Sequence, residues 1–207
     1  MRRTLSCLAM LVLAGCAADR APPAPEMASP YCPDPPAIVV NAQGVLLVPP
    51  ILAGGAVDWQ TAFATQAQFG IAQPARLAGR WPETAQGLAR LVMLGNAFAR
   101  DFRFQTLPSF GTFSMQQGVL ALRASLGIPA SLADGDLASV LLHTECALWR
   151  GDRVAAQAAL ARVASAADAL DRIAPRDNQA PRIPSATQAA ASQAARAMQL
   201  QDQRRRP

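Results

Sequence analysis

The sequence of 207 residues has no lysine, so all 19 of its basic residues are arginine, and it has a single histidine, His143. One histidine excludes any metal site built from several imidazole ligands. Charged residues make up 16 % of the chain and aromatic residues 5 %. After residue 36 the only glutamates are Glu83 and Glu145, which leaves few candidates for catalysis by paired carboxylates.

The basic residues are not clustered in a way that is typical of nucleic-acid binding. The formal charge of +5 falls to +3 when residues 1–15, with Arg2 and Arg3, are set aside, and Arg204–Arg206 account for that remainder. A nucleic-acid surface needs basic residues gathered on a folded face, so we expect no nucleic-acid partner. The terminal arginines are interpreted as a solvated tail, or as a contact to anionic lipid or lipopolysaccharide phosphate.

Long hydrophobic runs are also missing, apart from a short one near the N-terminus. Arg2 and Arg3 precede the apolar residues Leu8–Leu13, and the small residues Ala14 and Gly15 follow. A helix needs about 20 apolar residues to cross a hydrocarbon core of about 30 Å. The order of charge, short apolar run and small residues is that of an export signal, predicted to cover residues 1–15.

The end of this signal, "LAGC" at residues 13–16, resembles the lipobox of bacterial lipoproteins. The resemblance implies that Cys16 is acylated and becomes the first mature residue, whereas an ordinary signal peptide would leave it unmodified. Two or more acyl chains hold a protein stably on a membrane, so the membrane is an expected partner. Ala17 and Ala18 follow, with no Asp at the second position, which favours the outer membrane of a Gram-negative envelope.

Three further segments follow the signal. Residues 16–36 are rich in Pro and Ala, which predicts an extended, semi-rigid tether. Residues 37–175 are predicted to form a helical domain, which opens with two β-branched runs within 37–48 around turn-forming Asn41 and Gly44. Within residues 176–207 the apolar signal fades, and the stretch 185–206 contains only Met198 and Leu200 as large apolar residues, so we expect a frayed helix or a disordered basic tail there.

The predicted fold is all-α: a small bundle of antiparallel helix hairpins with a short β-hairpin near the N-terminus. Apolar residues recur at three- and four-residue spacing over 58–70, 82–104, 113–127 and 136–173, the last broken near Gly151. Helix starts are predicted at Asp58, at Trp81-Pro82-Glu83 and at Asp152. Residues 136–149 are apolar on two sides, which is typical of a helix buried between two layers.

Two cysteines, Cys32 and Cys146, remain beyond the signal and the predicted anchor. Because the cell envelope is oxidising, an isolated pair there tends to form a disulfide. In the alternative, Cys146 is a small buried hydrophobe and Cys32 is free.

The chemically active residue types do not form a catalytic pattern. His143 and Cys146 lie three apart, but metal binding needs three or four ligands and a nucleophilic pair needs an orienting third group. Glu83 fits a helix start better than a glycosidase pair with Glu145. Asp134 or Asp136 fits a helix cap better than a calcium loop. We therefore predict no metal, no cofactor and no enzymatic activity.

Two functional hypotheses remain. The first is a membrane-anchored scaffold or protein-interaction lipoprotein, which binds another envelope protein through a groove between helices. The second is a protein that binds a small apolar or lipidic ligand between helices, with Phe98, Phe102, Phe110 and Phe113 lining the pocket. In a simpler interpretation these phenylalanines belong to the core.

The lipobox resemblance makes a direct prediction. Cys16→Ser should release the protein from membranes or leave it as an unprocessed precursor, because no other apolar segment is long enough to hold it. Membrane fractionation and mass spectrometry of the N-terminus test this. Wild-type protein that is soluble in the periplasm with an unmodified Cys16 would contradict it.

Overall fold

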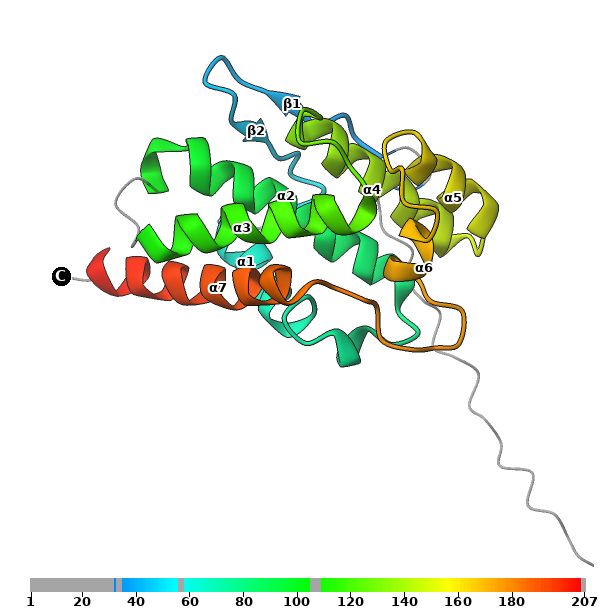
Figure 1. Cartoon of the computed structure of the whole chain (residues 1–207). Coiled ribbons are helices and arrows are strands. Elements are labelled where there is room, and N and C mark those ends of the chain that lie inside the picture. The colour runs from blue at the N-terminus through cyan, green and yellow to red at the C-terminus, as the bar shows by residue number, and fades with distance from the viewer. Residues whose placement is uncertain (1–31, 33–34, 56–57, 105–108, 206–207) are drawn as a thin grey trace, which may run out of the picture.

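A computed structural model of the chain describes residue 32 and residues 35–55, 58–104 and 109–205. A two-stranded hairpin lies against a group of helices (Figure 1), so the predicted all-α bundle with a short β-hairpin is confirmed. In chain order the elements are β1 (Val39–Val40), β2 (Leu46–Leu47), α1 (Trp59–Phe69), η1 (Pro74–Leu77), α2 (Trp81–Arg100), η2 (Phe102–Phe104), α3 (Ser109–Leu126), α4 (Asp134–Trp149), α5 (Arg153–Ala161), α6 (Ala169–Ile173) and α7 (Ser185–Arg205).

Helix α2 is the central helix of this arrangement. It packs against α1, α3, α4, α6, β2 and both 3-10 turns. Residues 91–98 are all buried, so this part of the helix is closed off from solvent on every side: Leu91, Val92, Met93 and Leu94 are each 0 % exposed, and Leu88 is 1 % exposed. A helix buried on all sides can only be covered by elements that approach it from every direction, and this sets the positions of the shorter helices.

A buried polar network attaches the hairpin to three helices. The backbone N–H of Leu46 in β2 donates to Asn96 Oδ1 in α2 at 2.9 Å, and Asn96 Nδ2 donates to Asp134 Oδ2 at 3.2 Å. Arg123 Nη2 of α3 donates to Asp134 Oδ1 at 2.7 Å. The network satisfies polar groups that the fold removes from water, and it joins β2, α2, α3 and the first turn of α4.

The role predicted for Asp134 or Asp136 as the cap of α4 is wrong. Ala133 is the capping residue and makes no side-chain cap bond, while both aspartates lie in the first helical turn. Asp134 instead accepts hydrogen bonds from Arg123 and Asn96, because these two tertiary partners outcompete the local one. By contrast, Asp58 caps α1 through Thr61 N–H and Asp152 caps α5 through Ala155 N–H, as predicted.

Predicted helix limits differ from the structure at three places. The helix predicted over 113–127 begins earlier, at Ser109. The helix predicted over 82–104 ends at Arg100, because Asp101 accepts the Arg103 N–H at 3.0 Å in a local turn that competes with the helix. The helix predicted to continue to residue 173 stops at Ala161 and resumes as α6. Between them the N–H of Ser165 donates to Gly127 O at 3.1 Å, a bond to the end of α3 that the chain makes only by leaving the helix.

The prediction of a frayed or disordered tail is wrong for residues 185–203, because helix α7 packs against α3 and α1. Its buried face consists mainly of alanines, with Ala190, Ala191 and Ala194 fully buried, together with Thr187 and Met198. They lie against glycines of α3: a Cβ placed on Gly118 would be 2.3 Å from the Cβ of Ala190. Small residues on both helices let the backbones approach closely. Van der Waals contact between the two helices then stabilises the packing without large apolar side chains.

Residues 1–16, with the predicted signal and the predicted lipidation site Cys16, lie outside the described residues, as does most of the predicted tether. Among the helices that the structure describes, none is both long and apolar enough to span a membrane.

The contact between α3 and α7 can be tested at Gly118. An added methyl group has no room against Ala190, so Gly118→Ala should lower the free energy of unfolding by about 1–3 kcal/mol. In an uncrowded helix the same change would stabilise by up to about 1 kcal/mol. Denaturant unfolding measures the difference, with the exposed Gln117→Ala as the control.

A double variant makes this test specific. Gly118→Ala combined with Ala190→Gly moves the methyl group to the other helix, so the loss should be smaller than the sum of the two single losses. A Gly118→Ala protein as stable as the wild type would show that the two helices are not in this contact.

Candidate functional site

An open groove of about 990 Å³ lies between α5, α6 and the start of α2. Small and apolar residues form most of it, and arginine and aspartate stand at its edge. We call it the α5–α6 groove and define it by Trp81, Leu148, Val154, Ala158, Ala161 and Leu170.

Helix α5 supplies one wall of the groove because it is apolar on two opposite sides. Ala156 and Leu160 are fully buried against the rest of the fold. At 100° per residue, Val154, Ala158 and Ala161 lie on the other side of the helix, and Val154 is 81 % exposed. A helix with two apolar sides is normally covered on both, and in the described structure α5 is covered on one.

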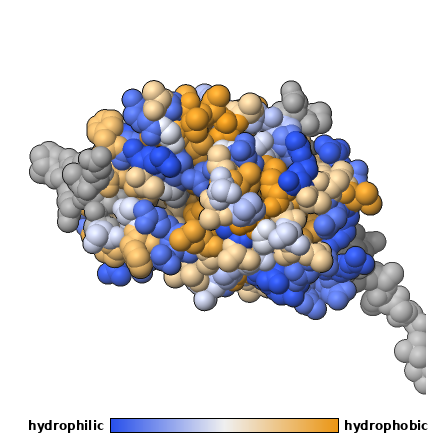
Figure 2. Space-filling view, turned by 45° about the horizontal axis from the view of Figure 1, so that its top comes forward, coloured by the Kyte–Doolittle hydropathy of each residue, from blue (hydrophilic) through white to orange (hydrophobic). Residues whose placement is uncertain are grey.

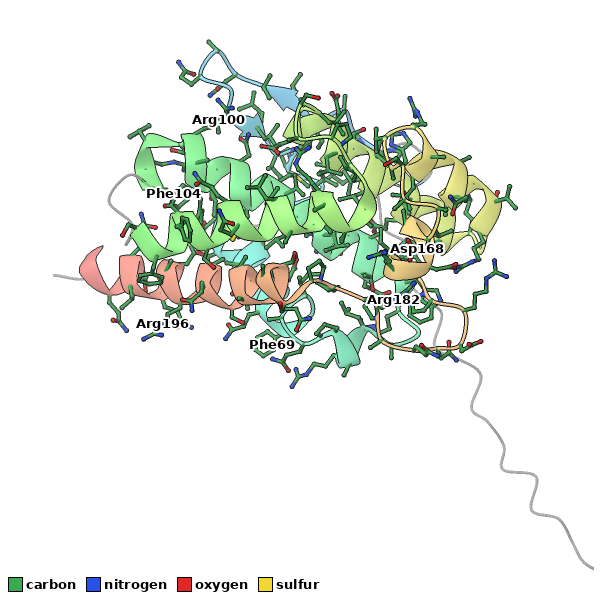
Figure 3. The ribbon with its side chains drawn as sticks, viewed as in Figure 1. Phe69, Arg100, Phe104, Asp168, Arg182 and Arg196 are labelled. Atoms are coloured by element: carbon green, nitrogen blue, oxygen red, sulfur yellow. A yellow bond between two sulfur atoms is a disulfide. The ribbon has the colours of Figure 1, made fainter. Side chains whose placement is uncertain are left out.

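Ion pairs hold the short helix α6 beside α5. Arg153 Nη2 of α5 donates to Asp171 Oδ1 of α6 at 2.6 Å. Asp168, just before α6, accepts from Arg172 at 2.9 Å and from Arg182 at 3.3 Å, and Figure 3 labels Asp168 and Arg182. The hydrogen bond from Arg172 lowers the pKa of Asp168, and the charges of both arginines act in the same direction.

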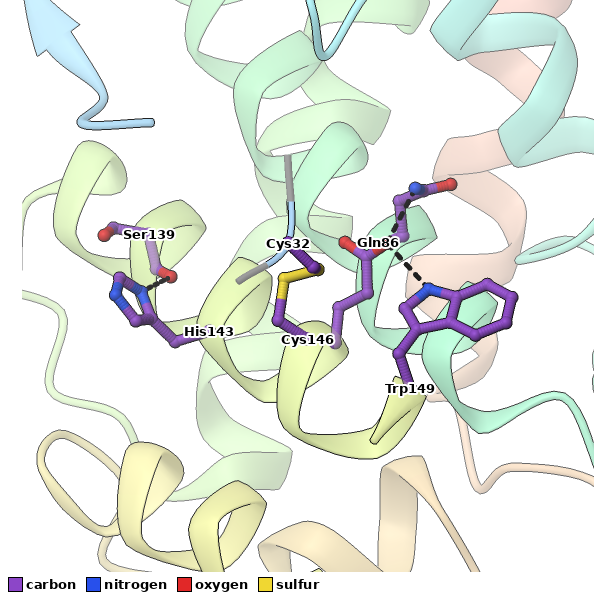
Figure 4. Close-up of a disulfide and its surroundings, with 7 residues drawn as sticks. Cys32, Gln86, Ser139, His143, Cys146 and Trp149 are labelled. Atoms are coloured by element: carbon purple, nitrogen blue, oxygen red, sulfur yellow. Dashed lines mark hydrogen bonds between the residues drawn. A yellow bond between two sulfur atoms is a disulfide. The ribbon is translucent and has the colours of Figure 1, made fainter. Parts of the chain in front are cut away.

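Cys32 and Cys146 form a disulfide, the pairing that the sequence predicts, with their Cα atoms 5.5 Å apart (Figure 4). This separation lies within the range that a bridge requires. Cys146 is 2 % exposed on α4. The bond therefore fixes the end of the predicted tether to a buried helix, 114 residues away along the chain.

A fully buried carboxylate lies next to this disulfide. Glu145 is 0 % exposed and accepts hydrogen bonds from Gln86 Nε2 at 2.8 Å and Trp149 Nε1 at 3.3 Å (Figure 4). Glu83 lies in the first turn of α2, as predicted, and pairs with Arg80 at 3.1 Å. The structure thus presents no open cleft between Glu83 and Glu145, because Glu145 has no exposed surface.

His143 is exposed, and its Nδ1 lies 2.8 Å from the backbone oxygen of Ser139 (Figure 4). The sulfur of Cys146 is bonded to Cys32, so the Cys–His pair weighed from the sequence is not assembled. Within the described ranges no three His, Cys, Asp or Glu side chains are grouped as metal ligands.

The four phenylalanines weighed as a ligand pocket do not line one cavity. Phe98 is 3 % exposed and contacts Phe104, with ring centroids 5.0 Å apart, so it belongs to the core. Phe102, Phe110 and Phe113 are 76 %, 41 % and 63 % exposed. The core interpretation therefore holds for Phe98 alone, and the pocket interpretation is wrong for this set.

The residues of the α5–α6 groove are not predicted from the sequence. Ala156 and Leu160 form the buried side of α5, and Val154, Ala158 and Ala161 form a second apolar stripe on the opposite side. That second apolar stripe is the signal that could have identified the groove. The position of α6 beside α5 cannot be predicted from the local sequence, because its ion pairs join residues up to 18 positions apart.

On the face of the molecule seen in Figure 2, apolar residues form several separate patches among hydrophilic ones. Comparison of the chain with protein-family models, curated proteins and solved structures finds no match. The function is therefore inferred from the residues themselves.

The disulfide can be tested through its effect on stability. In the chain-entropy model, closing a loop of this length stabilises by at most about 4–5 kcal/mol, so reductant should lower the unfolding free energy of the wild type by up to that amount. Cys32→Ser should have the lower stability from the start and should not respond to reductant. Denaturant unfolding of both proteins, with and without reductant, measures this. If reductant leaves the wild type unchanged, the bridge does not stabilise the fold.

Proposed function

We propose that the chain is a lipid-anchored envelope protein of Gram-negative type, without enzymatic activity, which binds a helix of another envelope protein in its α5–α6 groove. The observation that carries this proposal is the second apolar side of α5, where Val154 is 81 % exposed at the edge of an open groove. The lipobox at residues 13–16 supports the anchor at Cys16, and the Ala17–Ala18 sequence supports the outer membrane.

A helix fits this groove better than an extended chain does. The side chains of Ala158 and Ala161 on the α5 wall are small, so the backbone of a second helix can approach closely, as α7 approaches the glycines of α3. An extended peptide gains most of its affinity by pairing with an open strand edge, and no strand borders this groove. An amphipathic helix instead uses apolar residues at three- and four-residue spacing in an apolar groove.

The charges at the edge of the groove indicate the polar side of this partner. Arg153 and Arg176 both face Asp171, at 2.6 Å and 3.8 Å, so the edge has an excess of one positive charge. A partner helix with Asp or Glu beside its apolar stripe complements this edge. Such complementarity acts mainly on the association rate and on specificity.

The residues weighed for catalysis have structural partners, which also supports a binding role. The sulfur of Cys146 is in a disulfide, and Glu145 is enclosed with Gln86 and Trp149. A second candidate function is the binding of a small apolar or lipidic ligand in the same groove. Its volume of about 990 Å³ lies within the range of ligand pockets, roughly 300–1,000 Å³.

Photo-crosslinking in intact cells can decide between these functions. A photoreactive amino acid in place of Val154, and separately of Ala158, in the full chain should give one adduct of the same mass at both positions. The matched control is Val39, which is 58 % exposed on the hairpin and should not give this adduct. Mass spectrometry identifies what was captured.

The outcomes separate the alternatives. An envelope protein captured at both groove positions supports the proposal, and lipid-sized adducts at both support the ligand instead. Val154→Glu should weaken capture from position 158 at least about tenfold, since an unpaired charge is costly in an apolar contact. Equal capture at positions 39, 154 and 158, or no capture in the groove, contradicts both functions.

A further inference from the structure

A second cavity, of about 430 Å³, lies between α2, α3 and the loop that leads into α4. Its volume is in the lower part of the range of small-molecule pockets, roughly 300–1,000 Å³. It lies beside residues 95–100 of α2, whereas the α5–α6 groove lies beside Trp81 at the other end of that helix. At 1.5 Å per residue, the two sites are about 20 Å apart along α2. We call this cavity the α2–α3 pocket.

Two helices line the pocket with residues at three- and four-residue spacing, which share one face of a helix. These residues are Asn96, Ala99 and Arg100 of α2 and Gln116, Leu120 and Arg123 of α3. The two helices pack side by side, since a Cβ on Gly95 would lie 2.9 Å from Val119. The two faces therefore form adjoining walls, and residues 130–134 close the pocket on a third side.

The α3 wall contains a buried charge that is fixed in place. Arg123 is 5 % exposed, and its Nη2 donates to Asp134 Oδ1 at 2.7 Å. Its Nη1 donates to the backbone oxygen of Pro129 at 3.1 Å. Asn96 Nδ2 donates to the other oxygen of Asp134 at 3.2 Å. These bonds join all three sides of the pocket, so a ligand meets walls that are already ordered.

Arg100 supplies the charge that the pocket leaves uncompensated. It is exposed, and none of the ion pairs within the described residues involves it. The neighbouring Asp101 is occupied by Arg103, which donates to it at 2.9 Å. Because Arg123 and Asp134 compensate each other, the described residues that line the pocket have an excess of one positive charge.

The side chain of Arg100 lies against the turn of the hairpin. A Cβ on Gly44 would lie 3.1 Å from Arg100 Nη1 and 3.6 Å from its Cδ, so the turn restricts where this long side chain can go. A side chain that is restricted beforehand loses less entropy when it binds an anion.

Much of the remaining lining is apolar. Leu120 is 49 % exposed, and Val119 and Leu132 are half-buried. A ligand that covers these side chains removes apolar surface from water, whereas a small inorganic anion at Arg100 would leave them exposed. The lining is therefore complementary to a ligand with one negative group and an apolar body.

We propose that the α2–α3 pocket binds a small organic acid, whose single carboxylate pairs with Arg100 and whose apolar body lies on Leu120 and Leu132. The planar guanidinium of arginine matches a carboxylate with two parallel hydrogen bonds. A phosphate group carries a charge of about −1.5 to −2. With one uncompensated arginine and with Asp134 in the lining, the pocket fits a monoanion better.

The test compares octanoate with octanamide, a neutral compound of nearly the same shape. It uses the mature chain with Cys16→Ser, exported by an ordinary cleavable signal, so that no acyl chain competes for an apolar site. Octanoate should bind at least about tenfold more tightly, because a hydrogen bond to a charged group is the stronger one. Isothermal titration calorimetry measures both affinities. In amide NMR spectra, octanoate should shift the signals of Gln116, Leu120 and Ser131, which line the pocket.

Variants then assign the two parts of the ligand. Arg100→Gln should bring the two affinities within about twofold of each other, and Arg100→Lys, which keeps the charge without the fork, should retain a smaller preference for octanoate. Leu120→Ser should weaken both ligands by a similar factor, about threefold. The matched control is Arg196→Gln: Arg196 is exposed on α7 and lies on the opposite side of the molecule from Arg100 in Figure 3. It should leave both affinities unchanged. Denaturant unfolding checks that all variants fold.

Four results would overturn the proposal. The first is a wild type that binds octanoate no more tightly than octanamide, or binds neither. The second is a preference for octanoate that survives Arg100→Gln. The third is displacement of octanoate by an equal concentration of inorganic phosphate, which would indicate a phosphate site.

The fourth is a set of octanoate-induced shifts at Val154, Ala158 and Leu170 in place of the pocket residues. It would place the acid in the α5–α6 groove and support the small-ligand alternative for that groove. None of these measurements uses the acyl anchor or a partner helix, so failure of this site is distinguishable from failure of the proposed function.

Discussion

Burial of α2 on every side is the constraint on which the rest of the fold depends. A 20-residue helix whose residues 91–98 are all buried needs cover from several directions, and a chain of this size supplies it with short helices. Because these covering helices crowd one another, small residues are needed where they meet, as in the contact between Gly118 and Ala190. The Asn96–Asp134–Arg123 network then lets β2, α3 and α4 meet at α2 without leaving a polar group unsatisfied.

The parts of this fold that the sequence predicts are those with a local cause. The stripe from Leu88 to Phe98 is a strong periodic signal in a long segment, and the caps at Asp58 and Asp152 depend on residues three positions away. The packing of helix α7 is not predicted, because its buried surface is mostly alanine, whose burial depends on glycines of α3 some 70 residues earlier. The stop at Asp101 and the gap before α6 arise from competing hydrogen bonds, which periodicity does not reveal.

The candidate sites also divide into one that the sequence predicts and one that depends on tertiary contacts. The pairing of Cys32 with Cys146 followed from counting cysteines and from the compartment that the signal implies, with no knowledge of the fold. The α5–α6 groove depends on where α6 is held, and the ion pair of Arg153 with Asp171 that holds it is tertiary. Phe102 shows how a local bond changes a functional interpretation: the turn at Asp101 takes it off the buried stripe of α2 and leaves it exposed.

The disulfide and the α5–α6 groove meet at α4. Cys146 lies on α4, so its bond to Cys32 joins the end of the predicted tether to that helix. Helix α4 packs against α5, and Leu148 near its end lines the groove. The disulfide therefore fixes the point at which the predicted tether meets the domain, on the helix beside the groove. For a chain anchored at Cys16, as proposed, a partner helix within reach of the same membrane would meet the groove at a raised effective concentration.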